Sequence, residues 1–239
     1  MWYALKWILF YVVIQFSIIF GFSFVYINNG NDPTLLGNYI NDVRIYIVLI
    51  LALIFIPLLI YKYKKLNIKE QKTNISKLIL MTICLSATYN ILAYYLDKYI
   101  LLSNLYSNNN NIIVGIISTV LIAPFIEELM FRGVIYNNLK SKYNIKKAML
   151  LTTILFCLSH FTLIQIIYTF IFGYILVYIY EKYQNIKYPI ILHMISNLTT
   201  TIISLFIIKD YLMINIIILI VSTFTLFLIY DKVIKTKEV

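Results

Sequence analysis

Two adjacent carboxylates, Glu127 and Glu128, lie in the middle of a long apolar run. Arg132 follows Glu128 by four residues, and both histidines of the chain, His160 and His193, fall in later apolar runs. A charged side chain at the centre of a membrane helix costs at least about 2.5–3.5 kcal/mol, so charged groups in such runs point to function. Carboxylates and imidazoles are also the groups that general acid–base catalysis uses most.

Helical spacing assigns separate roles to the two glutamates. Residues four apart share a helix face, whereas neighbours diverge by about 100°. Glu128 and Arg132 are therefore placed to form an ion pair within one helix, and Glu127 is left without a local partner. We expect Glu127 to act as a general base or acid and Glu128 to support the site.

The histidines have partners at the same spacing. His193 and Asn197 share a face and can donate hydrogen bonds toward one point, while Phe156 can pack against His160 and orient it. At about 1.5 Å per residue, Glu127 lies roughly 20 Å from Lys140, and His160 lies roughly 20 Å from Lys147. His193 and Asn197 lie roughly 9 and 15 Å from Lys187. These depths overlap, which predicts a polar cavity within the membrane, open to the cytoplasmic side.

A proline precedes the carboxylate pair. Pro124 removes a backbone donor and predicts a kink that frees the carbonyl near Val120.

The elements that must hold these residues are membrane helices. Of the 239 residues, 62% are hydrophobic and 13% charged, and the mean hydropathy of +0.86 lies far above that of soluble domains. The net charge of +10 would suggest nucleic acid in a soluble protein, but here the lysines cluster between spans. We expect one integral membrane domain over residues 1–239, embedded in a lipid bilayer and binding no nucleic acid.

The fold class predicted is all-α, a polytopic bundle of about eight transmembrane helices. The apolar runs place the spans near residues 5–27, 45–61, 78–101, 112–139, 148–161, 166–180, 188–208 and 211–230. A short helical hairpin turning near residues 161–165 is favoured over one long helix. One long helix would invert the orientation of the later spans and place the C-terminal lysines outside.

Charge asymmetry sets the orientation. With the N-terminus inside, the cytoplasmic segments hold fifteen lysines and the outer connections hold Arg44, Lys98 and Lys209. Both termini are then cytoplasmic. The composition, rich in Ile, Asn, Lys and Tyr, is typical of an AT-rich genome and points to a bacterial plasma membrane.

Three motifs in order resemble a known family. Glu127-Glu128-x-x-x-Arg132, Phe156-x-x-x-His160 and His193-x-x-x-Asn197 resemble those of the CPBP family of CAAX proteases and bacteriocin-processing enzymes, the type II CAAX prenyl endopeptidases. The resemblance covers residues 112–208, a catalytic core of the CPBP type.

The resemblance implies an intramembrane endopeptidase that cleaves a small peptide or a membrane protein. Glu127 and His160 would activate a water, and His193 and Asn197 would stabilise the oxyanion. Glu128, Arg132 and Phe156 would support the site. No cofactor is expected; the alternative is a divalent metal at Glu127, His160 and His193, although the zincin signature His-Glu-x-x-His is absent.

Other functions were weighed against the endopeptidase. A non-catalytic member of the family could act as a regulatory partner of another membrane protein or as a bacteriocin self-immunity factor. A proton-coupled transporter is disfavoured because no internal repeat is visible. An aspartyl dyad would need two membrane aspartates, and only Asp97 lies near a span.

Overall fold

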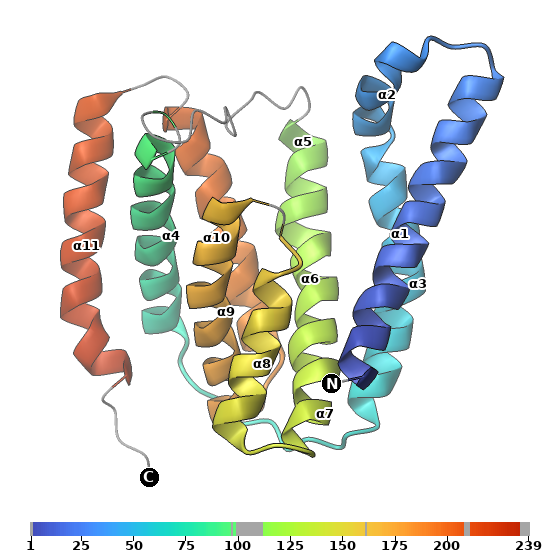
Figure 1. The fold of residues 1–239 in the computed structure, drawn as a ribbon. Helices are drawn as coiled ribbons and strands as arrows, with labels where there is room; N and C mark the ends of the chain where they lie inside the picture. Colours follow the sequence, from blue (N-terminus) through green and yellow to red (C-terminus); the bar gives the residue numbers. More distant parts are fainter. Residues whose placement is uncertain (1, 97, 99–111, 161, 208–210, 235–239) are drawn as a thin grey trace.

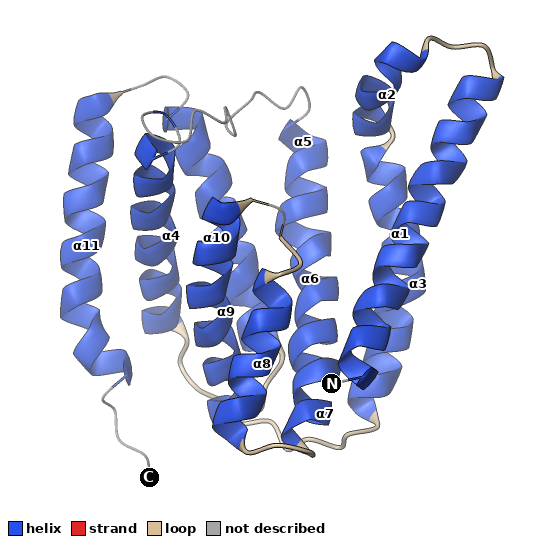
Figure 2. Cartoon of the chain, viewed as in Figure 1, coloured by secondary structure: helices blue, strands red, loops and turns tan. Residues whose placement is uncertain are grey.

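The computed structural model describes residues 2–96, 98, 112–160, 162–207 and 211–234. All regular structure within these ranges is helical (Figure 2). The predicted all-α fold is therefore confirmed. Asp97 and Lys209, which were used above, lie outside the described residues.

Eight rods and one short helix make up this part of the chain. Their bounds are α1 Trp2–Asn28, α2 Leu36–Asp42, α3 Arg44–Lys64, α4 Ser76–Leu96, a continuous rod Ile112–Lys140, α8 Ile145–Cys157, α9 Leu163–Tyr183, α10 Lys187–Ile207 and α11 Leu212–Ile234. The Ile112–Lys140 rod is divided into α5 Ile112–Gly115, the π-helix η3 Ile116–Ile122, α6 Ala123–Glu128, the π-helix η4 Leu129–Tyr136 and α7 Asn137–Lys140.

The rods stand side by side, and the lysine-rich connections gather at one end. In Figure 1 the links from α3 to α4, from α7 to α8 and from α9 to α10 all lie at the lower end, where α1 begins and α11 ends. We call this the lysine-rich end. The short helix α2, which the sequence did not predict, lies at the opposite end between α1 and α3.

Among the described residues, five helices are long and apolar enough to cross a membrane: α1, α3, α4, Ile113–Lys140 and α9. Their number indicates a multi-pass membrane protein. The count of eight spans stays a prediction. The predicted span 148–161 differs from the structure, because α8 is a helix of 13 residues that ends at Cys157.

The rod Ile112–Lys140 forms the centre of the bundle. All eight residues of η4, Leu129–Tyr136, are buried. They pack into the largest apolar core together with side chains of α3, α8 and α9, including Phe55, Phe156 and Tyr180. This packed layer lies between Glu127 and the lysine-rich end, and so it closes the interior below the carboxylates.

Candidate active site

The predicted ion pair between Glu128 and Arg132 is present, and it has a third member. Arg132 Nη1 donates to Glu128 Oε1 over 2.8 Å, and both side chains are fully buried. His193 Nδ1 lies 2.8 Å from the same oxygen. Glu128 thus joins α6 to α10, a contact that the sequence could not assign because 65 residues separate the two.

Arg132 also fixes the position of α9. Its Nη2 donates to the carbonyl of Gly173 over 2.9 Å, and its guanidinium lies 4.4 Å from the centre of the Phe156 ring. A Cβ on Gly173 would stand 2.8 Å from Phe156 Cδ1 and 3.4 Å from Arg132 Nη2. Sequence reasoning missed Gly173, because only the packing of α8 on α9 shows that a side chain has no room there.

Glu127 points away from the ion pair, as its spacing predicted. Its Oε2 lies 4.0 Å from His193 Nε2, and its side chain is 26% exposed, whereas that of Glu128 is 0% exposed. The two neighbouring carboxylates therefore have different surroundings. Glu128 is held by Arg132 and His193, whereas Glu127 is partly exposed.

His160 follows the end of α8 rather than lying within it. Its Nδ1 is 3.1 Å from the carbonyl of Phe156, and the two rings meet edge to face with centroids 5.2 Å apart. A carbonyl only accepts, so Nδ1 carries the hydrogen. In the neutral ring Nε2 is then a free acceptor. The predicted packing of Phe156 on His160 is confirmed.

Asn197 is held by a carbonyl that Pro124 leaves free. Ala123 N–H bonds the carbonyl of Ser118, five residues back, in the register of the π-helix η3. The same spacing from Pro124 falls on Thr119, and proline has no N–H. Asn197 Nδ2 donates to the Thr119 carbonyl over 2.7 Å instead. A freed carbonyl was predicted at Val120; the π register moves it by one residue.

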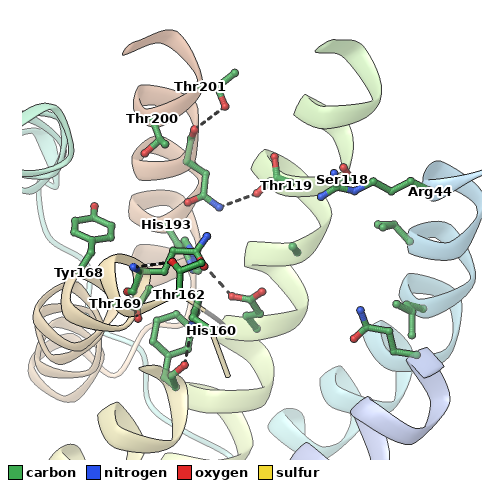
Figure 3. A pocket seen from close by; sticks show the side chains of 18 of the residues that line it. Arg44, Ser118, Thr119, His160, Thr162, Tyr168, Thr169, His193, Thr200 and Thr201 are labelled. Carbon is green, nitrogen blue, oxygen red and sulfur yellow. Dashed lines mark hydrogen bonds and ion pairs between the residues drawn. The ribbon is translucent and has the colours of Figure 1, made fainter. Parts of the chain in front are cut away.

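These side chains surround one hollow of about 800 Å³, which we call the central hollow. Glu127, His160, His193 and Asn197 all line it, and Figure 3 shows His193 on α10 and His160 in the turn after α8. Arg44 in α3 and Thr201 in α10, which also line it, lie toward the end opposite the lysines. The lining therefore gives no support to the predicted opening at the lysine-rich end, because the buried η4 layer fills that side.

The alternative of a divalent metal at Glu127, His160 and His193 stays a prediction. In the part of the chain that the structure describes, no group of three His, Cys, Asp or Glu side chains is placed to hold a metal ion. Both histidines make their hydrogen bonds through Nδ1, which leaves Nε2 of each ring available to the hollow that both line.

Comparison with known proteins agrees with the geometry. Residues 109–199 match the family model of the type II CAAX prenyl endopeptidase Rce1-like proteins. This segment is an Rce1-like domain. The family is one of proteases, and the resemblance seen in the three motifs is confirmed. No curated protein and no solved structure matches the chain.

The Rce1-like domain contains every site residue that the sequence predicted. The matched segment runs from the start of the central rod through Asn197 in α10. The side chains of α1, α2 and α3 that line the central hollow, such as Gln15 and Arg44, lie before it. The hollow is therefore built partly by the domain and partly by the N-terminal helices.

Proposed function

We propose that the chain is an intramembrane endopeptidase that hydrolyses a peptide bond in the central hollow. The observation that carries this proposal is the pairing of unequal carboxylates: Glu127 faces the hollow, while Glu128 is sealed against Arg132 and His193. One guanidinium neutralises one carboxylate, so a packing cluster would have no need of a second glutamate in lipid. The Rce1-like domain supports the proposal, because its family consists of proteases.

Two acceptors are available to activate a water. The Glu127 carboxylate and His160 Nε2 can each accept a hydrogen bond from the water. These two bonds turn the lone pairs of the water oxygen toward a substrate carbonyl. The water oxygen then bonds to the carbonyl carbon, and its proton passes to Glu127. The hydrogen bond from His160 Nδ1 to the Phe156 carbonyl and the contact with the Phe156 ring hold the imidazole in the required orientation.

Two donors are available for the oxyanion. The Asn197 amide has two hydrogens, and the bond to Thr119 uses one. His193 donates Nδ1–H to Glu128, so its Nε2 donates to an oxyanion when the ring is doubly protonated. Preorganised donors of this kind are often the largest contribution to acyl-transfer catalysis.

Collapse of the tetrahedral intermediate completes the reaction. The C–N bond breaks, the oxyanion re-forms a carbonyl, and Glu127 returns its proton to the leaving nitrogen. The products are one carboxylic acid and one amine, and the carboxylate of Glu127 is regenerated.

The proposed substrate is a small peptide, such as a bacteriocin leader, or a membrane protein. The proposed setting is a bacterial plasma membrane, with about eight spans and both termini on the cytoplasmic side. The ends of α1 and α11 at the lysine-rich end support this topology.

The test compares newly formed N-termini in membranes of cells that express the wild type or Glu127→Gln. Glutamine keeps the volume of the side chain and cannot take up the proton of water. The matched control is Glu181→Gln, which makes the same change at a carboxylate bonded to Lys140 at the lysine-rich end. We expect a set of N-termini that Glu127→Gln removes and Glu181→Gln retains.

Equal sets of N-termini in the three strains, at equal membrane levels of the protein, would refute the protease function. A biological phenotype that survives Glu127→Gln would instead favour a non-catalytic regulatory or immunity role.

A further inference from the structure

Arg44 stands alone at the far end of the central hollow. It is the first residue of α3, it is half-buried, and it lines the hollow. Figure 3 shows its side chain extending from α3 toward Ser118, across the hollow. Within the described ranges Arg44 makes no hydrogen bond or ion pair, and the nearby Asp42 is exposed and does not pair with it.

The acids of the described part of the chain do not neutralise this guanidinium. Glu127 and Glu128 contact His193, and Glu181 and Glu70 pair with lysines. Apart from Glu127 and the histidines, the hollow is lined by apolar and neutral polar groups such as Gln15. A guanidinium carries five donors in a planar fork that fits the two oxygens of a carboxylate.

We propose that Arg44 binds a carboxylate of the peptide substrate, about four residues from the bond that is cleaved. The spacing follows from the central rod. Ser118 lines the same hollow as Arg44, on the segment η3 that contacts α3, and it precedes Glu127 by nine residues, or roughly 13 Å of helix. An extended peptide covers this length with about four residues at about 3.3 Å each. The inference rests on the proposed function and names the substrate feature that the same hollow selects.

The carboxylate has two sources, an acidic side chain or the C-terminus of the peptide. A lipid phosphate is a weaker fit, because the side chain turns into the hollow rather than outward. Recognition of anionic lipid surfaces also relies on clusters of basic residues, and Arg44 is a single cation.

The test uses the full chain in phosphatidylcholine vesicles with a mixture of synthetic peptides. The mixture includes peptides with free or amidated C-termini, with and without Asp and Glu, and mass spectrometry locates the cuts. The variants are Arg44→Gln, Arg44→Lys and Glu127→Gln. Lys98→Gln is the matched control, since Lys98 lies just beyond α4 at the same end of the bundle, over the ring of Tyr94.

We expect a carboxylate about four residues from the cuts made by the wild type. Arg44→Gln should lower kcat/KM for such peptides roughly 10-fold to 100-fold, as expected for one charged hydrogen-bonded contact. It should leave peptides without a carboxylate unchanged. Arg44→Lys should retain part of the preference and Lys98→Gln all of it. The amidated and the Asp- and Glu-free peptides show which source supplies the carboxylate.

Three outcomes would overturn the inference. Glu127-dependent cleavage with no carboxylate preference, or an equal loss for all peptides in Arg44→Gln, refutes it and leaves the proposed function standing. An effect of Arg44→Gln that arises only after phosphatidylglycerol is added assigns Arg44 to lipid. Absence of any Glu127-dependent cleavage refutes the proposed function and the inference with it.

Discussion

Replacing Gly173 by alanine tests whether the contact of α8 with α9 sets the active geometry. The new Cβ would stand 2.8 Å from Phe156 Cδ1, where ordinary contact begins near 3.4 Å, so the ring must move by about 0.6 Å. Phe156 is fully buried, so it has little free space to move into. Its ring centroid lies 5.2 Å from that of His160 and 5.8 Å from that of His193. A shift of the ring therefore reaches both histidines.

The expected cost follows from these contacts. Overpacking of a filled core costs about 1–3 kcal/mol. In a chain of this size that lowers the melting temperature by roughly 5 °C. A misplacement of about 1 Å at a catalytic group costs on the order of 100-fold, so a shift of about half that should lower the rate roughly 10-fold. Thermal unfolding in detergent and the yield of Glu127-dependent products measure the two effects.

The matched control is Gly21→Ala, because Gly21 lies within α1 and a Cβ there meets nothing within 4 Å. It should leave both measurements near the wild type. A second variant, Phe156→Leu combined with Gly173→Ala, should regain stability relative to Gly173→Ala alone because the smaller side chain removes the clash. Wild-type stability and product yield in Gly173→Ala would refute the reasoning.

Three further changes probe the site and its surroundings. Glu128→Ala leaves its arginine partner buried and without its carboxylate, so we expect a loss of about 3–5 kcal/mol, seen as reduced folded protein in thermal unfolding; a neutral result would contradict the burial of this ion pair. Pro124→Ala supplies an N–H that can compete for the Thr119 carbonyl, so product yield should fall several-fold while the melting temperature holds or rises; unchanged yield would show that the freed carbonyl does not matter. Asn41→Cys, an exposed position that lines the hollow, should react with an impermeant thiol reagent outside intact cells, and Lys142→Cys should not; the reverse pattern would invert the proposed topology.

The sequence was sufficient where the relevant contacts are local. Glu128 and Arg132 are four residues apart in one helix, so their contact follows from helical geometry alone. Phe156 and His160 have the same spacing, and their rings meet although α8 ends at Cys157. The all-helical fold follows from apolar runs whose length matches a bilayer.

The remaining features depend on contacts between distant segments. The bond of His193 to Glu128 requires the relative placement of α10 and α6, which no spacing encodes. Gly173 matters only because Phe156 fills the space beside it. The π register that moves the free carbonyl to Thr119 is set by packing as well as by the proline. The position of the hollow depends on which half of the central rod is tightly packed. The sequences before and after the carboxylate pair are both apolar, so the sequence does not show that the later half, η4, is the buried one.

The order in which the ion cluster forms has a consequence for biosynthesis. The Glu128–Arg132 bond lies within one helix turn, so it can close as soon as the central rod leaves the ribosome. His193 is synthesised 65 residues later and then docks on a carboxylate whose charge is already balanced. Glu127, Glu128 and Arg132 together then carry one net negative charge into the membrane, whereas the two carboxylates without the arginine would carry two. The arginine acts at this stage as an insertion aid, well before there is an active site to support.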